Sequence, residues 1–185
     1  KTDQYELGDF SQRADLYAIS TCSVTENANR KCRKIIRGAL RRSPNAHVAV
    51  TGCYAQLKPE EISKIPGVDL VLGTGEKFNL NNYLESIGRN GGTSVYSCDI
   101  SEVESFVSSY SFGERTRSYL KVQDGCNYNC SFCTIPLARG VSRCDTTENV
   151  VLKANEIANN GIKEIVLTGV NIGDFVAGRD DNFLN

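Results

Sequence analysis

The chain has 185 residues, 40% of them hydrophobic, and a formal net charge of −1. This length fits one domain or two small ones, and the near-neutral charge excludes a general attraction to nucleic acid or to membrane surfaces. No run has the apolar length of a transmembrane helix, so we expect no membrane partner. Eight cysteines without a signal peptide favour metal binding in a reducing, cytoplasmic compartment over disulfide bonds.

The ends of the sequence indicate an internal piece of a longer protein. The chain begins at Lys1, contains no Met and stops at Asn185, soon after a strand-like segment. We therefore expect the complete protein to extend beyond both ends.

The first part of the chain alternates strand and helix signals. Residues Ser23–Glu26 have the Ser-x-x-Glu pattern of a capping box, which predicts the start of a long helix. One apolar stripe follows along it, made of Ala28, Cys32, Ile35, Ile36, Ala39 and Leu40. Strands are predicted over residues 16–20, 47–51 and 69–72, and further helices over 59–64 and 77–87. Successive βα units of this length predict a parallel sheet with helices on both faces.

From residue 88 to residue 118 glycines and serines replace helical periodicity, and only Val95–Cys98 has the character of an edge strand. We place a domain boundary near residue 112, so that residues 1–112 form the first domain with its linker and residues 113–185 begin a second.

A second βαβ unit follows the boundary. Its strands are predicted over 119–122 and 164–168, and its helix runs from near Asp145 to Gly161. Between the first strand and the helix lies a cysteine-rich loop. This loop leaves the carboxyl end of a strand, where α/β proteins place their active sites.

The cysteine-rich loop carries Cys126, Cys130 and Cys133 within eight residues. Three thiolates at these spacings can hold three irons of a [4Fe–4S] cluster and leave the fourth iron open to a non-protein ligand. A structural zinc site is the alternative, but it needs a fourth ligand, and His47 is the only histidine in the chain. Disulfides fit poorly, because three cysteines cannot all pair.

Cys22 and Cys53 each follow a predicted strand and precede a helix, where backbone N–H groups favour a thiolate. Neighbouring parallel strands would bring both sulfur atoms to one edge of the sheet. The alternative is that both are small buried residues, and geometry alone leaves the two readings open. We interpret Cys32, Cys98 and Cys144 as structural.

Several motifs, taken in this order, resemble those of the radical S-adenosylmethionine (SAM) methylthiotransferases. They are Thr21–Ala28, Thr51–Gln56, Pro66–Asp69, Lys121–Cys126, Thr134–Gly140 and Leu167–Gly173. The Gly-Cys-Tyr-Ala-Gln form of residues 52–56 is most similar to the branch that acts on N6-threonylcarbamoyladenosine at position 37 of tRNA.

The resemblance implies an α/β fold: a Rossmann- or flavodoxin-like methylthiotransferase domain, then the first βα units of a partial radical SAM (β/α) barrel. It implies SAM and two [4Fe–4S] clusters in the full-length enzyme. Cys126, Cys130 and Cys133 would hold the cluster that binds SAM, and Cys22 and Cys53 an auxiliary cluster. The third auxiliary ligand belongs to an upstream Gly-Cys-x-x-Asn segment that this chain lacks.

The implied activity is insertion of a methylthio group at C2 of adenosine. A 5′-deoxyadenosyl radical from SAM would first abstract the hydrogen atom from C2. Its partners would be the tRNA anticodon loop and an electron donor, and we expect a monomer. A barrel needs ~200 residues, so this chain alone would be inactive.

Alternatives within the family are methylthiolation of a ribosomal-protein Asp or of another tRNA adenosine. An electron-transfer iron–sulfur protein, which would need a fourth cysteine, and a zinc-stabilised RNA-binding module are alternatives from other classes.

Further residues have two readings each. By the resemblance, Phe132 contacts the adenine of SAM, and Gly169 and Asn171 cradle its methionine end. The other role for Phe132 is to anchor its loop to the core, and both roles can hold. Arg139 and Arg143 would pair with a SAM carboxylate or a tRNA phosphate, or are ordinary surface charges. A basic helix face would contact tRNA phosphates or is merely solvated; it comprises Arg30, Arg33, Lys34, Arg37 and Arg41.

Overall fold

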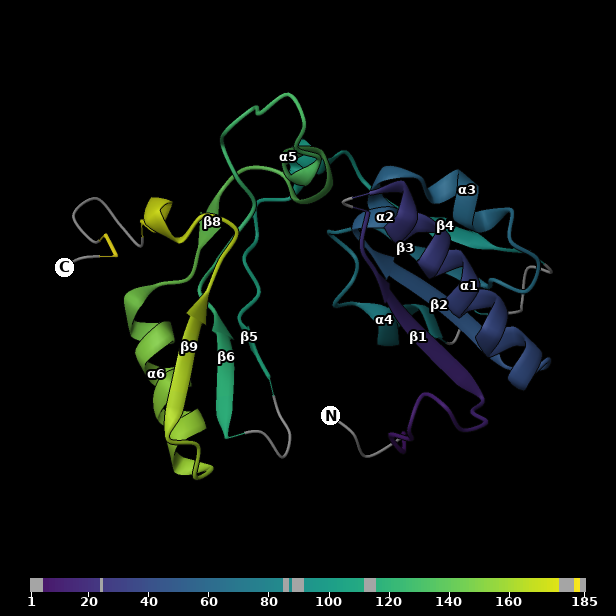
Figure 1. The fold of residues 1–185 in the computed structure, drawn as a ribbon, viewed down its shortest axis with the longest axis horizontal. Coiled ribbons are helices and arrows are strands. Elements are labelled where there is room, and N and C mark those ends of the chain that lie inside the picture. Colours follow the sequence, from purple (N-terminus) through teal and green to yellow (C-terminus); the bar gives the residue numbers. More distant parts are fainter. Residues whose placement is uncertain are drawn as a thin grey trace. The chain divides into compact units, whose positions relative to one another are not determined.

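The computed structural model describes residues 5–23, 25–84, 87, 92–111, 116–176 and 182–183. The chain forms two compact units, Lys1–Ile100 and Ser101–Asn185 (Figure 1). The predicted boundary near residue 112 lies outside the described residues. In the described part of the chain, no helix is long and apolar enough to cross a membrane.

The first unit contains a four-stranded parallel sheet in the order β1-β2-β3-β4. Its strands are β1 Leu16–Thr21, β2 His47–Gly52, β3 Leu70–Leu72 and β4 Ser94–Tyr96. The three predicted strands are therefore confirmed within one residue at each end. The predicted edge strand also forms at the sheet edge, but it begins one residue earlier than expected and ends two residues sooner.

Helices cover both faces of this sheet, as the βα pattern predicts. On one face α1 (Glu26–Arg42) packs with α2 (Cys53–Leu57) and α3 (Pro59–Ser63) around Val48 and Val50. On the other face α4 (Leu80–Leu84) lies against a smaller cluster that contains Ala49. The alternation of residues 48 to 50 between the two clusters is the two-residue period of a strand buried on both sides.

The amino-terminal end of α1 differs from the predicted capping box. Thr25, not Ser23, is the N-cap, and its Oγ1 accepts a hydrogen bond of 3.1 Å from the Ala28 amide. The Ser23 hydroxyl instead donates to Asn29 Oδ1 at 2.9 Å. Two serine- or threonine-type residues two positions apart compete for one cap, and the residue next to the first helical turn takes it.

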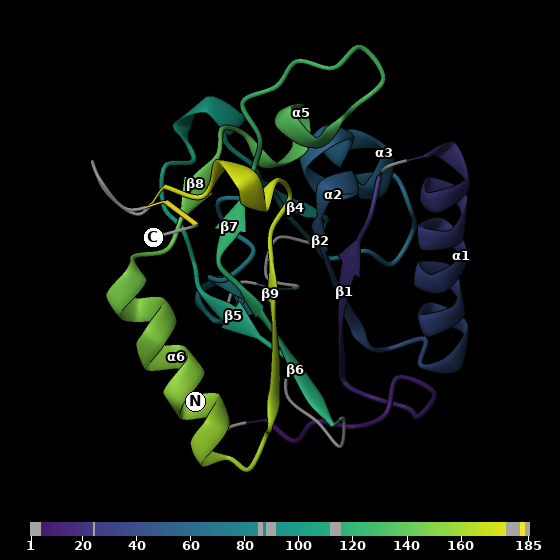
Figure 2. The ribbon, with the colours of Figure 1, turned by 60° about the vertical axis from the view of Figure 1, so that its left-hand side comes forward.

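The second unit contains a three-stranded sheet in the order β5-β6-β9, made of Ser109–Tyr110, Arg117–Lys121 and Glu164–Thr168. Strands β6 and β9 are parallel, and α6 (Thr147–Asn159) connects them along one side of the sheet (Figures 1 and 2). This is the predicted βαβ unit, although β6 begins two residues earlier and ends one residue sooner than the strand predicted over 119–122. Its core is formed by Leu120, Val122, Ile157 and Phe175.

Short elements surround the carboxyl ends of β6 and β9. Strands β7 (Gln123–Asp124) and β8 (Arg143–Cys144) pair antiparallel, and α5 (Ile135–Arg139) lies between them in the chain. The 3₁₀ turn η2 (Ile172–Asp174) follows β9. Another 3₁₀ turn, η1 (Ile100–Glu102), precedes β5 in the chain. The cysteine-rich loop connects β7 to α5, so the sheet and the small hairpin fix both of its ends.

Candidate functional site

The cysteine-rich loop is fixed at its base and exposed at its middle. The Cys126 amide donates to the Gly140 carbonyl at 3.0 Å, and Asn127 Oδ1 accepts from the Ser142 amide at 2.9 Å. Gly125 opens the loop with φ +73°, and a Cβ at this position would lie 2.0 Å from the Val141 carbonyl oxygen. The close approach of the two chain segments therefore requires glycine.

All three loop thiols are free. Cys130 is exposed, and Cys126 and Cys133 are half-buried. A turn between them is closed by the Cys133 amide, which donates to the Cys130 carbonyl at 3.0 Å. Among the described residues, no three His, Cys, Asp or Glu side chains lie close enough to form a metal site. By donor chemistry the loop fits a [4Fe–4S] cluster, because it offers three accessible thiols on one anchored segment.

A second loop, after β9, faces the base of the cysteine loop. The amides of Val170 and Asn171 both donate to Gln123 Oε1, at 2.7 and 3.0 Å. From the cysteine loop itself, the Tyr128 hydroxyl donates to Asp174 Oδ1 at 3.3 Å. The charge of Asp174 is the main cause that raises the pKa of Tyr128. Two polar links therefore connect the loops that sequence analysis associates with the cluster and with SAM.

Sequence analysis missed Gln123, Tyr128 and Asp174. Gln123 and Tyr128 flank the first loop cysteine, so their position in the motif was visible. Their partners were not, because they lie on a segment more than 40 residues away in sequence.

Phe132 is 88% exposed, so the reading in which its ring anchors the loop to the core is wrong. The Asn171 side chain donates from Nδ2 to Asp174 Oδ2 at 2.8 Å. Gly169 lies against Gln123, because a Cβ at this position would come within 2.8 Å of Gln123 Oε1. A SAM contact for these three residues stays a prediction.

The two arginines near the loop differ. Arg139 Nη1 donates to Asp124 Oδ1 at 3.1 Å, and its side chain remains 37% exposed. Arg143 is only 9% exposed and donates to the carbonyls of Val103 and Arg139, at 2.8 and 2.7 Å. Burial lowers its pKa. Arg143 therefore binds two backbone carbonyls and is too buried to contact a phosphate, whereas part of the Arg139 side chain remains accessible.

In the first unit, Cys22 and Cys53 come directly after Thr21 and Gly52, which are paired across β1 and β2. Cys22 is exposed and Cys53 half-buried. The reading in which both are small buried residues is therefore wrong for Cys22. Gly52, at φ +97°, brings the chains close, since a Cβ here would lie 2.3 Å from the Thr21 carbonyl oxygen.

The other cysteines make internal contacts, through the sulfur atom in Cys32 and Cys144 and through the backbone carbonyl in Cys98. Cys32 is buried, and its thiol points to the Cys22 carbonyl at 3.6 Å. The Cys98 carbonyl accepts from Gln56 Nε2 at 3.0 Å. Cys144 packs against the second core, and its sulfur accepts from the Val176 amide at 3.4 Å.

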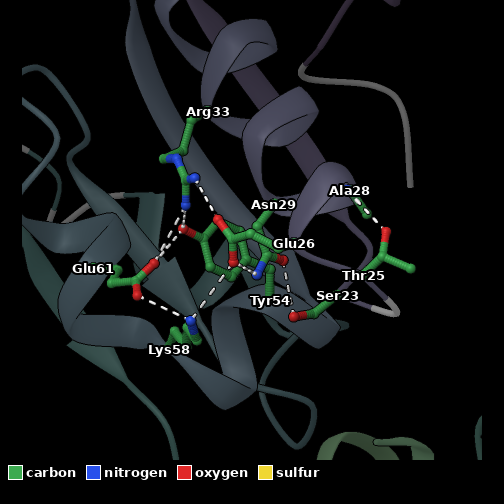
Figure 3. A network of polar contacts seen from close by, with 9 residues as sticks. All are labelled: Ser23, Thr25, Glu26, Ala28, Asn29, Arg33, Tyr54, Lys58 and Glu61. Carbon is green, nitrogen blue, oxygen red and sulfur yellow. Dashed lines mark hydrogen bonds and ion pairs between the residues drawn. The ribbon is translucent and has the colours of Figure 1, made fainter. Parts of the chain in front are cut away.

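A polar network beside Cys53 joins α1 to α2 and α3 (Figure 3). Its centre is Tyr54, whose side chain is fully buried. The Tyr54 hydroxyl donates to Glu61 Oε2 and accepts from Arg33 Nη1, both at 2.6 Å. Arg33 also pairs with Glu26 at 2.8 Å, and Lys58 with Glu61 at 3.1 Å. The network holds the first turns of α1, which begins four residues after Cys22, against α2, which begins at Cys53.

The predicted basic face exists on α1, where its five members line a shallow groove of about 310 Å³. Arg33 belongs to the network of Tyr54, which leaves its side chain only 25% exposed. The other four are exposed, and among the described residues none of them has an acidic partner within 4.0 Å; they are Arg30, Lys34, Arg37 and Arg41.

Comparisons with known proteins match a different family model in each of the two units. Residues 1–73 match the model of the uncharacterized protein family UPF0004, and residues 120–177 match that of the Radical SAM superfamily. Among similar curated proteins are threonylcarbamoyladenosine tRNA methylthiotransferases of Bacillus subtilis, 42% identical over 97% of this chain, and of Aquifex aeolicus, 41% identical over 92%. A tRNA-2-methylthio-N(6)-dimethylallyladenosine synthase of Protochlamydia amoebophila is 31% identical over 90%.

The chain covers 40%, 42% and 37% of these three relatives, so it spans about two-fifths of their length. Membership of the Radical SAM superfamily implies SAM and a [4Fe–4S] cluster. The two domain matches in this order, together with relatives aligned over nearly the whole chain, show that it belongs to the radical SAM methylthiotransferase family.

Proposed function

We propose that this chain contributes the iron–sulfur and SAM-binding part of an enzyme that methylthiolates C2 of N6-threonylcarbamoyladenosine at position 37 of tRNA. The observation that carries the proposal is the three-thiol loop at the carboxyl ends of β6 and β9, beside the loop of residues 169–173. The 42% identical relative named as a threonylcarbamoyladenosine tRNA methylthiotransferase favours this substrate.

In this proposal Cys126, Cys130 and Cys133 hold the cluster. When bound, the cluster supplies the electron that cleaves the C–S bond of SAM. The chain's own residues bind and orient: Gln123 and Tyr128 fix the two loops, and the exposed ring of Phe132 is available to cover the adenine.

A second cluster at Cys22 and Cys53 belongs to the same proposal. Support comes from the pairing of Thr21 with Gly52, which sets both cysteines at one end of adjacent strands. The Tyr54 network holds the two following helices together at this place. Cys22 and Cys53 would supply two of the three ligands that the resemblance implies for this cluster.

The tRNA would meet the α1 face through Arg30, Lys34, Arg37 and Arg41, with Arg139 as a further contact in the second unit. Four exposed cations along one helix face suit a phosphate backbone. Arg33 and Arg143 are left out, because internal contacts occupy them. A separate electron donor, a monomeric state and a cytoplasmic location complete the proposal.

The first test is anaerobic reconstitution of the chain with iron and sulfide, followed by EPR of the reduced protein with and without SAM. The proposal expects a [4Fe–4S] signal that shifts when SAM is added. A signal that ignores SAM would instead favour an electron-transfer protein, and tight zinc binding in place of iron would favour a zinc-stabilised module.

The substrate is tested with the full-length protein and two tRNAs, one bearing N6-threonylcarbamoyladenosine and one bearing N6-dimethylallyladenosine at position 37. Mass spectrometry of the digested nucleosides should find the methylthio group only on the first. Modification of the second tRNA alone would move the protein to the other branch of the family.

A further inference from the structure

Gln123 lies at the base of the cysteine loop and makes hydrogen bonds from both ends of its side-chain carboxamide. It is 1% exposed. Its Nε2 donates to the Gly125 carbonyl at 2.8 Å, to Ser142 Oγ at 2.9 Å and to the Asp124 carbonyl at 3.2 Å. Its Oε1 accepts from the amides of Val170 and Asn171. A carboxamide has two N–H groups and two lone pairs, so both ends of this side chain are fully used and one N–H is shared between two of the three acceptors.

These bonds join three segments that are separate in the chain. Gly125 begins the cysteine loop, Ser142 follows α5, and Val170 and Asn171 form the turn after β9. A buried polar group with all partners in place holds its surroundings in one arrangement, because any displacement leaves a buried donor or acceptor unpaired. The absence of a Cβ at Gly169 lets the turn approach Gln123 this closely.

We propose that Gln123 is a positioning residue for SAM: it sets the turn of residues 169–171 at a fixed place relative to the cysteine loop before the cofactor binds. This inference rests on the proposed function. Its consequence is that loss of the Gln123 carboxamide weakens SAM binding while the cluster ligands remain intact.

The first unit offers a matched control. Gln56 makes a similar brace there, since its Nε2 donates to the Cys98 carbonyl at 3.0 Å and its Oε1 accepts from the Thr74 amide at 2.7 Å. Replacing Gln56 removes the same kind of hydrogen bonds from a unit that the proposal does not connect with SAM. The pair of variants therefore separates loss of a structural brace from loss of cofactor positioning.

The experiment compares Gln123→Met and Gln56→Met with the unchanged chain after anaerobic reconstitution. Both substitutions keep the length of the side chain and remove its polar atoms. Iron and sulfide content, the SAM concentration that half-shifts the EPR signal, and hydrogen exchange of the Val170 and Asn171 amides are measured. For Gln123→Met we expect unchanged iron, faster exchange at both amides and roughly tenfold weaker SAM binding. For Gln56→Met we expect SAM binding and both amides to be unchanged.

Equal SAM affinity in Gln123→Met and the unchanged chain, or an equal loss in both variants, overturns the positioning role. If Gln123→Met does not fold, Gln123→Asn replaces it, because this variant keeps the carboxamide but is one methylene too short for its partners. If the unchanged chain holds its cluster but does not respond to SAM, the proposed function fails with the inference. A normal response that Gln123 variants leave unaltered defeats the inference alone.

Discussion

The two units place cysteines at the carboxyl ends of parallel strands in different ways. In the second unit three thiols lie on one loop of eight residues, so their proximity is a property of the sequence. In the first unit Cys22 and Cys53 come from different strand ends and depend on the register that pairs Thr21 with Gly52. A local ligand set therefore tolerates changes in the sheet, whereas a distributed set is only as stable as the fold that assembles it.

Removal of one loop thiol should have the largest effect, because the second unit depends on all three. Cys130→Ala should abolish the [4Fe–4S] signal of the second unit, because two remaining thiolates cannot hold three irons. Iron analysis and EPR after anaerobic reconstitution measure the loss. Cys32→Ala, at a buried cysteine of α1, is the control and should keep this signal. A full signal in Cys130→Ala would contradict cluster ligation by the loop.

The dependence of the first unit on its register is tested at Gly52. Gly52→Ala combines a strained φ with a Cβ 2.3 Å from the Thr21 carbonyl oxygen, so we expect destabilisation by about 3 kcal/mol or failure to fold. Urea unfolding measures the change. Gly38→Ala is the matched control, because its Cβ meets nothing within 4 Å inside α1, and it should stabilise by about 0.5–1 kcal/mol. Equal effects of the two variants would show that strand-end geometry does not limit stability.

The network that braces the two strand ends gives a smaller effect. Tyr54→Phe removes the hydroxyl between Arg33 and Glu61 and should cost about 1–2 kcal/mol in unfolding free energy. Tyr5→Phe changes an exposed ring and serves as control. If the two substitutions cost the same, the Tyr54 hydroxyl contributes nothing beyond an exposed one.

The same network predicts a pH dependence. The hydrogen bond from Tyr54 is the first cause that lowers the pKa of Glu61, and Arg33 is the first that lowers the pKa of Glu26. A carboxyl whose pKa is lower in the folded state stabilises the fold above its ordinary value of about 4.5 and loses this contribution as pH falls through the folded pKa. Urea unfolding of the first unit should therefore become easier on acidification below this value. The dependence should be shallower in Tyr54→Phe, and an unchanged slope would exclude coupling between Tyr54 and Glu61.

The smallest expected effect concerns the α1 surface. A plot of log binding constant against log salt concentration for a tRNA anticodon stem-loop has a negative slope. Arg37→Gln should make this slope less negative by about 0.7–0.9, the value for one phosphate contact. Arg33→Gln, on the same helix, should instead lower the unfolding free energy and leave this slope unchanged, because Arg33 is bound to Tyr54 and Glu26. Equal slopes in the two variants would remove α1 from the proposed RNA surface.

Much of the fold was predictable because it is encoded locally. The apolar runs of β1, β2 and β9 and the stripe of α1 identify these elements from a few residues. The short helices α2 and α5, each of five residues, were missed, because little more than one turn does not repeat an apolar spacing; α3, of the same length, was predicted over 59–64 and forms over Pro59–Ser63. The helix predicted over 77–87 begins three residues later than expected, at Leu80, and is described as far as Leu84; residues 85 and 86 lie outside the described part.

The candidate site divides in the same way. The loop cysteines could be proposed as ligands from their spacing together with the motifs around them. Arg33 and Arg143 could not be separated from their basic neighbours, because their internal partners Tyr54 and Val103 come from other elements. The Gln123 brace was also hidden, since its Oε1 contacts residues 47 and 48 positions later that only the β6–β9 pairing brings near.

The exposure of the cysteine loop sets a condition on how the protein matures. Thiols that are accessible before metal arrives can be oxidised to sulfenic acid or to disulfides, and further oxidation is irreversible. The backbone bonds at the base of the loop do not involve the sulfur atoms, so an oxidised chain would keep its fold while losing its ligands. If the loop holds the proposed cluster, the chain can be correctly folded and still unable to bind iron, so the redox state of these thiols before iron arrives would limit cluster assembly.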